Sequence, residues 1–175
     1  WDHQLRSDGI GDNLFLGSIV ALDADTGDYR WHYQVMPKES WDYNAAMDIV
    51  LADIEIKGET KKVLMQAPKN GFLYVIDRQT GKLIGADKFS KSNWASKIDL
   101  ETGRPVMGEA ADYQKRPKHL WPGPIGAHNW QAMAYSPKQK LVFIPEMQHG
   151  ATYIKSEMPN LRENFLNLSI ITTYD

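Results

Sequence analysis

The sequence contains no cysteine, and it has no excess of basic residues. The lack of cysteine excludes a disulfide scaffold, a thiolate-ligated zinc site and a cysteine nucleophile within these 175 residues. Because 20 basic residues stand against 22 acidic ones, we expect no broad basic surface and no nucleic-acid partner. No run approaches the roughly 18 apolar residues of a membrane-spanning helix. An apolar content of 42% still allows a sizeable core.

A sustained helical period is also missing before residue 150, and only residues 158–168 have a weak helical pattern. Short apolar or alternating runs are separated instead by turn clusters rich in Gly, Asn, Asp and Pro. We predict strands at residues 15–22, 29–35, 49–56, 62–66, 72–76, 82–86, 131–135 and 141–144. Strands at this spacing indicate an all-β protein.

One turn motif occurs three times, with its aspartates at Asp23, Asp77 and Asp99. Each copy has an apolar residue, Asp, two variable residues, Thr-Gly and then a second predicted strand. Gly supplies the positive φ of a hairpin turn, and the Asp and Thr side chains cap local N–H groups. One copy could be a chance occurrence of a common turn. Three copies favour a repeat architecture, as in the blades of a β-propeller.

The repeat spacing conflicts with the length of the chain. Asp23 and Asp77 are 54 residues apart, and a four-stranded blade takes ~40–50 residues. The sequence therefore holds about three to four blades, and an incomplete ring would leave open strand edges. We expect residues 1–175 to be a partial propeller domain that is incomplete at both ends. Residues 147–175 carry no motif that we can assign.

Several motifs together resemble one family. The Asp-x-x-Thr-Gly turn followed by Trp31 resembles the tryptophan-docking motif of eight-bladed quinoprotein propellers. Further matches, in the family's order, are Gly11-Asp12-Asn13-Leu14-Phe15-Leu16, Trp41-Asp42-Tyr43, Ala67-Pro68-Lys69-Asn70-Gly71 and Gly126-Ala127-His128-Asn129-Trp130. Residues 93–96 and 102–105 fit the quinohaemoprotein alcohol dehydrogenases in particular. The resemblance covers residues 1–146 and implies a partial eight-bladed β-propeller.

The resemblance implies a periplasmic oxidoreductase that oxidises alcohols to aldehydes with pyrroloquinoline quinone and Ca²⁺. In this family an Asp beside the quinone is the general base, and a hydride passes from the alcohol to a quinone carbon. The electrons then leave one at a time, often through a haem c. The implied partners are a small alcohol and an electron acceptor such as a cytochrome c or haem domain. No Cys-x-x-Cys-His haem site occurs in this sequence.

Four residues are candidates for the site on the strength of this resemblance. Asp42 matches the catalytic base and is also a candidate neighbour of Ca²⁺, whose other ligands would lie outside this sequence. Lys69 matches a residue that reaches the quinone oxygens, where a fixed cation stabilises developing negative charge. Asn129 and Trp130 match positions at the polar edge and ring plane of the cofactor. Asn44 favours Ca²⁺, because lanthanide-using relatives carry an Asp there.

Each candidate also has a plain structural explanation. Asp42 could cap a loop, Lys69 could be a solvated turn lysine, Asn129 could belong to a turn, and Trp130 could be a core residue. At the level of the whole protein, one alternative is a non-catalytic propeller scaffold that binds proteins or peptides. A weaker alternative is a hydrolase that pairs Asp42 with Asp48 or Asp53.

The oxygen ligands available for a metal ion limit what the chain can do alone. A hard cation takes ~6–8 oxygen ligands, and the sequence offers only Asp42 and Asn44 at the matching position. The five histidines lack the pairing of a metal site, although His128 directly precedes Asn129. We therefore expect the isolated chain to bind the quinone weakly and to turn over no alcohol.

Overall fold

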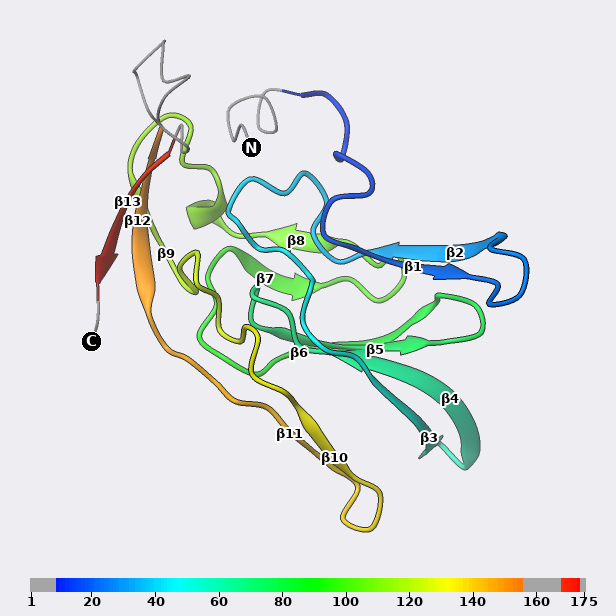
Figure 1. Cartoon of the computed structure of the whole chain (residues 1–175). Helices are drawn as coiled ribbons and strands as arrows, with labels where there is room; N and C mark the ends of the chain where they lie inside the picture. Colours follow the sequence, from blue (N-terminus) through cyan, green and yellow to red (C-terminus); the bar gives the residue numbers. More distant parts are fainter. Residues whose placement is uncertain (1–8, 156–167, 174–175) are drawn as a thin grey trace.

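The computed structural model describes residues 9–155 and 168–173, and its regular secondary structure is strands apart from one 3₁₀ turn (Figure 1). In chain order the elements are β1 (Ser18–Leu22), β2 (Tyr29–Gln34), β3 (Val50–Ile56), β4 (Glu59–Gln66), β5 (Phe72–Asp77), β6 (Leu83–Lys88), β7 (Ala95–Ile98), β8 (Pro105–Met107), the 3₁₀ turn η1 (Glu109–Ala111), β9 (Lys118–Leu120), β10 (Ala134–Ser136), β11 (Leu141–Phe143), β12 (Gly150–Lys155) and β13 (Leu168–Thr173). Among the described residues no helix is long and apolar enough to cross a membrane.

The eight predicted strands correspond to β1–β6, β10 and β11, with ends that shift by up to three residues. The β7–β8 hairpin falls on the third copy of the turn motif. Three strands were not predicted, namely β9, β12 and β13. The weak helical pattern at 158–168 lies outside the described residues except for Leu168, which begins a strand. The all-β prediction is confirmed.

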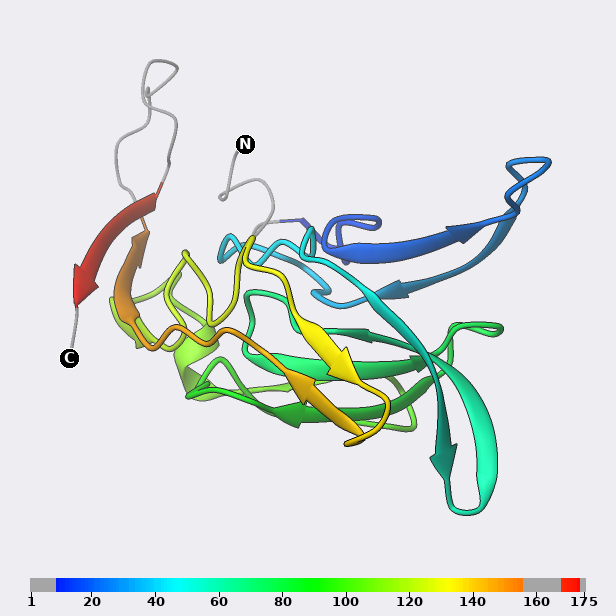
Figure 2. The same cartoon turned by 60° about the horizontal axis from the view of Figure 1, so that its bottom comes forward.

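The central sheet has the four antiparallel strands of one propeller blade, in the order β3-β4-β5-β6. The other sheets are smaller: β1–β2, β7–β8 and β10–β11 are two-stranded, and β13-β12-β9 has three strands. Figures 1 and 2 show the β1–β2 and β10–β11 hairpins on different sides of the central sheet. A partial propeller accounts for this arrangement.

Side chains on β5 alternate between two cores, because successive residues of a strand point to opposite faces. Phe72 and Tyr74 pack into the larger core, which also contains Tyr33 of β2. Leu73 and Val75 pack into the smaller core with residues of β4, β10 and β11. The central sheet is therefore covered on both faces, as a blade between two neighbours would be.

The three repeated turns have the same hydrogen bonds. In each one Oδ1 of the Asp accepts the N–H groups two and three residues later, and the Gly N–H donates to the Asp carbonyl. The turn glycines have φ values between +70° and +76°: Gly27, Gly81 and Gly103. The repeat in the sequence is thus a repeat in structure.

Aromatic side chains of β2 dock onto the second and third turns. Nε1 of Trp31 donates to the Arg78 carbonyl at 3.2 Å, and its indole lies against Gly81. The Tyr33 hydroxyl donates to the Gly103 carbonyl at 2.7 Å. A single strand therefore ties three hairpins together, and the tryptophan-docking contact implied by the resemblance is present.

Candidate active site

Asp42 and Lys69, which come from two separate motifs, lie side by side. Nζ of Lys69 is 3.3 Å from Oδ2 of Asp42. The Lys69 side chain is only 8% exposed, whereas that of Asp42 is 22% exposed. Lys69 is therefore not a solvated turn lysine. The pair consists of a cation enclosed by protein and a carboxylate that is partly exposed.

Lys69 is placed by the tight turn between β4 and β5. The Gly71 N–H donates to the Pro68 carbonyl at 3.4 Å, and Gly71 has a φ of +86°. Oδ1 of Asn70 accepts the Phe72 N–H, and the Asn70 carbonyl accepts Nε1 of the buried Trp94 at 2.7 Å. These bonds fix the turn on the aromatic core, so the Lys69 side chain starts from a rigid base.

Asp42 lies between two buried aromatic residues, Trp41 and Tyr43. Its φ is +67°, a left-handed conformation that is uncommon for a residue with a side chain. Oε1 of Glu39 accepts the N–H groups of both flanking residues, at 2.8 Å from Trp41 and 2.9 Å from Tyr43. The Tyr43 hydroxyl donates to the Pro122 carbonyl. The neighbours of Asp42 are anchored, and its carboxylate reaches Lys69.

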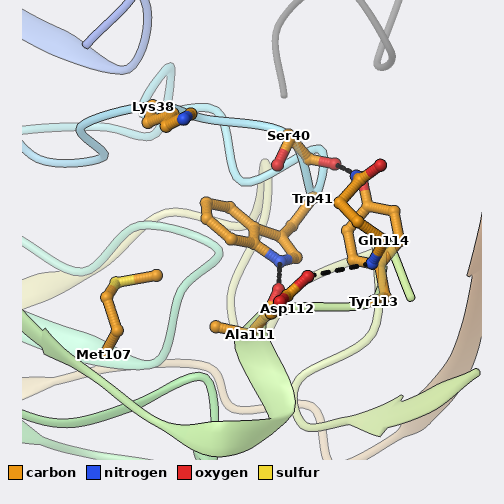
Figure 3. A pocket seen from close by; sticks show the side chains of 8 residues that line it. All are labelled: Lys38, Ser40, Trp41, Met107, Ala111, Asp112, Tyr113 and Gln114. Atoms are coloured by element: carbon orange, nitrogen blue, oxygen red, sulfur yellow. Dashed lines mark hydrogen bonds between the residues drawn. The ribbon is translucent and has the colours of Figure 1, made fainter. Parts of the chain in front are cut away.

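The loop that carries Asp42 is hydrogen-bonded to the segment around η1 (Figure 3). Nε1 of Trp41 donates to the Ala111 carbonyl at 3.0 Å, and the Tyr113 hydroxyl donates to the Ser40 carbonyl at 2.6 Å. A cavity of about 390 Å³ borders this support, and its lining residues are Lys38, Ser40, Trp41, Met107, Ala111, Asp112, Tyr113 and Gln114. Asp42 does not line this cavity, so the cavity belongs to the support of the loop.

The segment that carries Asn129 and Trp130 packs against Lys69 at its first residues. Gly126, with φ +93°, lies so close that a Cβ there would stand 2.4 Å from Cγ of Lys69. The Ala127 N–H donates to the Lys69 carbonyl at 2.9 Å, and Nδ2 of Asn129 donates to the Ile125 carbonyl at 2.8 Å. Trp130 is 84% exposed and is therefore not a core residue. Its indole face is available to a ligand.

His128 fastens this segment to the Lys69 turn. It is fully buried, with Nδ1 at 2.6 Å from the Ala67 carbonyl oxygen and Nε2 at 2.6 Å from that of Gln131. Ala67 precedes Lys69 in the turn between β4 and β5, and Gln131 follows Trp130, so the ring lies between a carbonyl of each segment. The histidine that precedes Asn129 thus acts as a cross-brace between the two loops.

A metal ion would find only part of its coordination shell here. Among residues 9–155 no group of three or more acidic or histidine side chains could hold a metal. Asp48 accepts the Met133 N–H at 2.9 Å, and Asp53 pairs with Arg78 at 3.0 Å, so neither forms a carboxylate pair with Asp42. Within the described part of the chain, Asp42 is the acidic residue that pairs with Lys69. An anionic or quinone oxygen, in contrast, could interact with the positive charge of Lys69.

Glu39 is the site residue that sequence reasoning missed. It stands two residues before Trp41 and could have been noticed as an acidic residue preceding the Trp-Asp-Tyr motif. Its function in bracketing Asp42 depends on the fold of the loop, which the sequence alone does not give. The close approach of Gly126 to Lys69 was missed for the same reason.

Comparison with known proteins identifies the family of the chain. Residues 5–88 match the family model described as glucose/ethanol/alcohol dehydrogenase, beta-propeller domain, of the PQQ type. Over 153 residues, or 87% of the chain, it is 53% identical to quinohemoprotein alcohol dehydrogenase ADH IIB of Pseudomonas putida. That alignment covers 22% of the relative, so the chain spans about a fifth of its length.

Solved structures give the same result. Quinohemoprotein alcohol dehydrogenase ADHIIG from Pseudomonas putida HK5 superposes with a TM-score of 0.90 at 45% identity, covering 97% of this chain and 26% of that one. A europium-containing methanol dehydrogenase superposes with a TM-score of 0.88 at 32% identity, covering 98% of this chain and 30% of that one. The chain belongs to the family of pyrroloquinoline-quinone-dependent alcohol dehydrogenases, of which it represents part of the β-propeller.

Proposed function

We propose that the protein containing this chain oxidises alcohols to aldehydes, with Asp42 as general base and pyrroloquinoline quinone bound against Lys69. The observation that carries this proposal is the Asp42–Lys69 pair, in which a partly exposed carboxylate lies 3.3 Å from an enclosed ammonium. The names of the relatives, which are alcohol dehydrogenases, support the reaction class.

The opposite charges of Asp42 and Lys69 give the two residues different roles in the proposed reaction. Bound pyrroloquinoline quinone supplies the acceptor for the hydride. The Asp42 carboxylate accepts the hydroxyl proton of the alcohol, for which a partly exposed oxygen is required. The Lys69 ammonium remains in place as a fixed positive charge close to where negative charge develops, and it needs no reorganisation during the reaction.

Asn129 and Trp130 would complete the binding site. Nδ2 of Asn129 donates one hydrogen to the Ile125 carbonyl, which leaves a second amide hydrogen and Oδ1 for a polar ligand edge. The exposed indole of Trp130 offers an apolar face to an aromatic ring. Gly126 and His128 fasten this segment to the Lys69 turn, so the two halves of the site would be fixed relative to each other.

The proposal also covers the metal ion, the electron acceptor and the cellular location. Asp42 would contribute one ligand to Ca²⁺, and the remaining oxygens would come from outside this chain. The neutral Asn44 is the residue that favours Ca²⁺ over a lanthanide. The electrons would leave to a haem domain or a cytochrome c, and we propose a periplasmic location. Alone, the chain would bind the quinone weakly and be inactive.

The test uses the full-length protein, reconstituted with pyrroloquinoline quinone and Ca²⁺ and assayed with ethanol and an artificial electron-accepting dye. We expect turnover, and we expect Asp42→Asn to lower kcat by about 10²–10⁴-fold. Asp53→Asn is the matched control, because Asp53 pairs with Arg78 and makes no contact with the pair. Full activity of the Asp42→Asn enzyme would rule out the assigned base. Failure of the wild-type protein to bind the quinone would favour a non-catalytic scaffold.

A further inference from the structure

We propose that Glu39 is a positioning residue that holds Asp42 in its productive backbone conformation, and that it does so as a hydrogen-bond acceptor and not through its charge. The significance for catalysis rests on the proposed function of Asp42. The structural part stands on its own, because it concerns only two backbone N–H groups and the carboxyl group that accepts them.

The geometry is that of a bracket around one residue. One oxygen, Oε1 of Glu39, lies 2.8 Å from the Trp41 nitrogen and 2.9 Å from the Tyr43 nitrogen. Asp42 lies between these two residues, so the bracket fixes the Asp42–Tyr43 peptide unit directly after it and the Ser40–Trp41 peptide unit one residue before it. Glu39 itself is 3% exposed, which keeps competing water away from the bonds.

Asp42 needs such support because its φ is +67°. For residues with a Cβ this left-handed region is strained, although Asp tolerates it better than most. Strained backbone persists only where the surroundings over-determine it. Without the bracket, the loop could relax towards negative φ, and the carboxylate would swing away from Nζ of Lys69.

The other anchors of the loop act on different atoms. The Tyr113 hydroxyl donates to the Ser40 carbonyl, and the Tyr153 hydroxyl donates to the Trp41 carbonyl at 2.9 Å. These tyrosines hold carbonyl groups, whereas Glu39 holds the N–H groups on either side of Asp42. If Glu39 were removed, the loop would stay attached to the core through these carbonyl groups, while the Asp42–Tyr43 peptide unit lost the acceptor that holds it.

The variants Glu39→Gln and Glu39→Ala separate the acceptor from the charge. The amide oxygen of Gln can occupy the place of Oε1 and accept both N–H groups, while the negative charge is lost. Ala removes the acceptor altogether. Glu55→Ala, which removes an exposed carboxylate on β3, is the matched control.

The first readout is amide hydrogen exchange at Trp41 and Tyr43 in the full-length protein, followed by NMR or by mass spectrometry of the peptide that spans them. We expect slow exchange in the wild-type, Glu39→Gln and Glu55→Ala proteins, and exchange at least about tenfold faster in Glu39→Ala. This readout does not depend on any bound cofactor or on turnover. Unchanged exchange in Glu39→Ala would overturn the bracket itself.

The second readout is steady-state kinetics of the reconstituted enzyme. We expect Glu39→Ala to lower kcat by about 100-fold with KM unchanged, because the base is misplaced while the substrate pocket persists. Glu39→Gln should restore kcat to near the wild-type value. Low kcat in Glu39→Gln with protected amides would show that the charge matters and would overturn the acceptor role. Faster exchange in Glu39→Ala with unchanged kcat would confirm the two hydrogen bonds but overturn the positioning role of Glu39, whereas the Asp42→Asn variant tests separately whether Asp42 is the base.

Discussion

The indole of Trp31 lies so close to Gly81 that a Cβ on this glycine would stand 2.8 Å from the ring atoms Cδ2 and Cε3. The first hairpin thus inserts an aromatic side chain into the turn of the central sheet. Gly27 occupies the equivalent place in the first turn, with a φ of +76° against +75° for Gly81, and nothing lies within 4 Å of its virtual Cβ. Two glycines with the same backbone therefore differ only in what docks on them.

Replacing the turn glycines by alanine should separate backbone strain from docking. Gly27→Ala carries only the cost of a left-handed alanine, roughly 1–2 kcal/mol. Gly81→Ala adds the displacement of Trp31, an overpacking cost of about 1–3 kcal/mol. Gly103→Ala should fall between them, because its Cβ would stand 3.1 Å from Cε2 of Tyr33. Denaturant unfolding of the three variants measures the order.

Equal destabilisation by the Gly27 and Gly81 substitutions would contradict the docking explanation. A double variant, Gly81→Ala with Trp31→Ala, provides the control. Removing the indole should cancel much of the extra cost at Gly81, since the added methyl group would enter space that the ring has left.

The repeat and the central sheet could be predicted from the sequence because both are local patterns. Period-2 runs such as residues 72–76 report which side chains are buried, and Asp-x-x-Thr-Gly reports a turn within five residues. β12 was missed although Ala151 and Tyr153 are both buried on alternate positions. Its run begins with Gly150 and follows a stretch without strand character, so the alternation is too short to stand out.

Residues of the candidate site could be predicted from sequence motifs, but the contacts between them could not. Asp42 and Lys69 were identified by their motifs, yet their 3.3 Å contact joins segments 27 residues apart in the chain. Gly126 and Glu39 act only through that assembly, by lying on Lys69 and by bracketing Asp42. No local pattern in the sequence encodes such contacts, because they depend on how the loops pack on the aromatic core.

Gly126→Ala should damage the site while leaving most of the fold intact. The new methyl group would stand 2.4 Å from Cγ and 2.7 Å from Cα of Lys69, so either Lys69 or the segment towards Trp130 must move. We expect kcat/KM of the reconstituted enzyme to fall about 100-fold. Titration of the full-length protein with the quinone, followed by absorbance, should show weakened binding.

Gly27→Ala is again the control for Gly126→Ala, since it introduces a left-handed alanine far from any contact. If the Gly126 variant bound the quinone as tightly as the Gly27 variant, the close approach of Gly126 to Lys69 would not be a functional constraint.

The ion pair between Asp12 and Arg104 should make stability dependent on acid and salt. Two bonds of 2.8 and 2.9 Å join these side chains, which are about half exposed. The hydrogen bond from Arg104 lowers the pKa of Asp12, so the stabilisation is present above the unfolded pKa near 3.9 and is lost as the pH falls through the folded pKa. We expect Arg104→Gln to cost less than about 1 kcal/mol at neutral pH.

Two comparisons test this pair by denaturant unfolding. The cost of Arg104→Gln should shrink as the pH falls through the folded pKa of Asp12, because the carboxylate is then neutral, and it should also shrink in 1 M salt, which screens the pair. Asp28→Asn is the control, because it neutralises an exposed carboxylate that accepts the Thr26 hydroxyl in the first turn. A cost that stayed constant across pH and salt would mean that Arg104 contributes by packing alone.

Tyr33 should make the fold sensitive to alkali. Burial raises the pKa of its phenol, and the hydroxyl donates to the Gly103 carbonyl at 2.7 Å. Because the folded protein holds the neutral form, its contribution is complete below the unfolded pKa near 10 and is lost as the pH rises towards the folded value. We expect Tyr33→Phe to cost about 1 kcal/mol at pH 7 through the lost hydrogen bond.

The difference in unfolding free energy between Tyr33→Phe and the wild type should narrow above pH 10, because the phenylalanine variant has no phenol to ionise there. Unfolding curves at pH 7, 9 and 11 measure this, and a difference that widened with pH would show that the Tyr33 hydroxyl does not depend on staying protonated to hold the third turn.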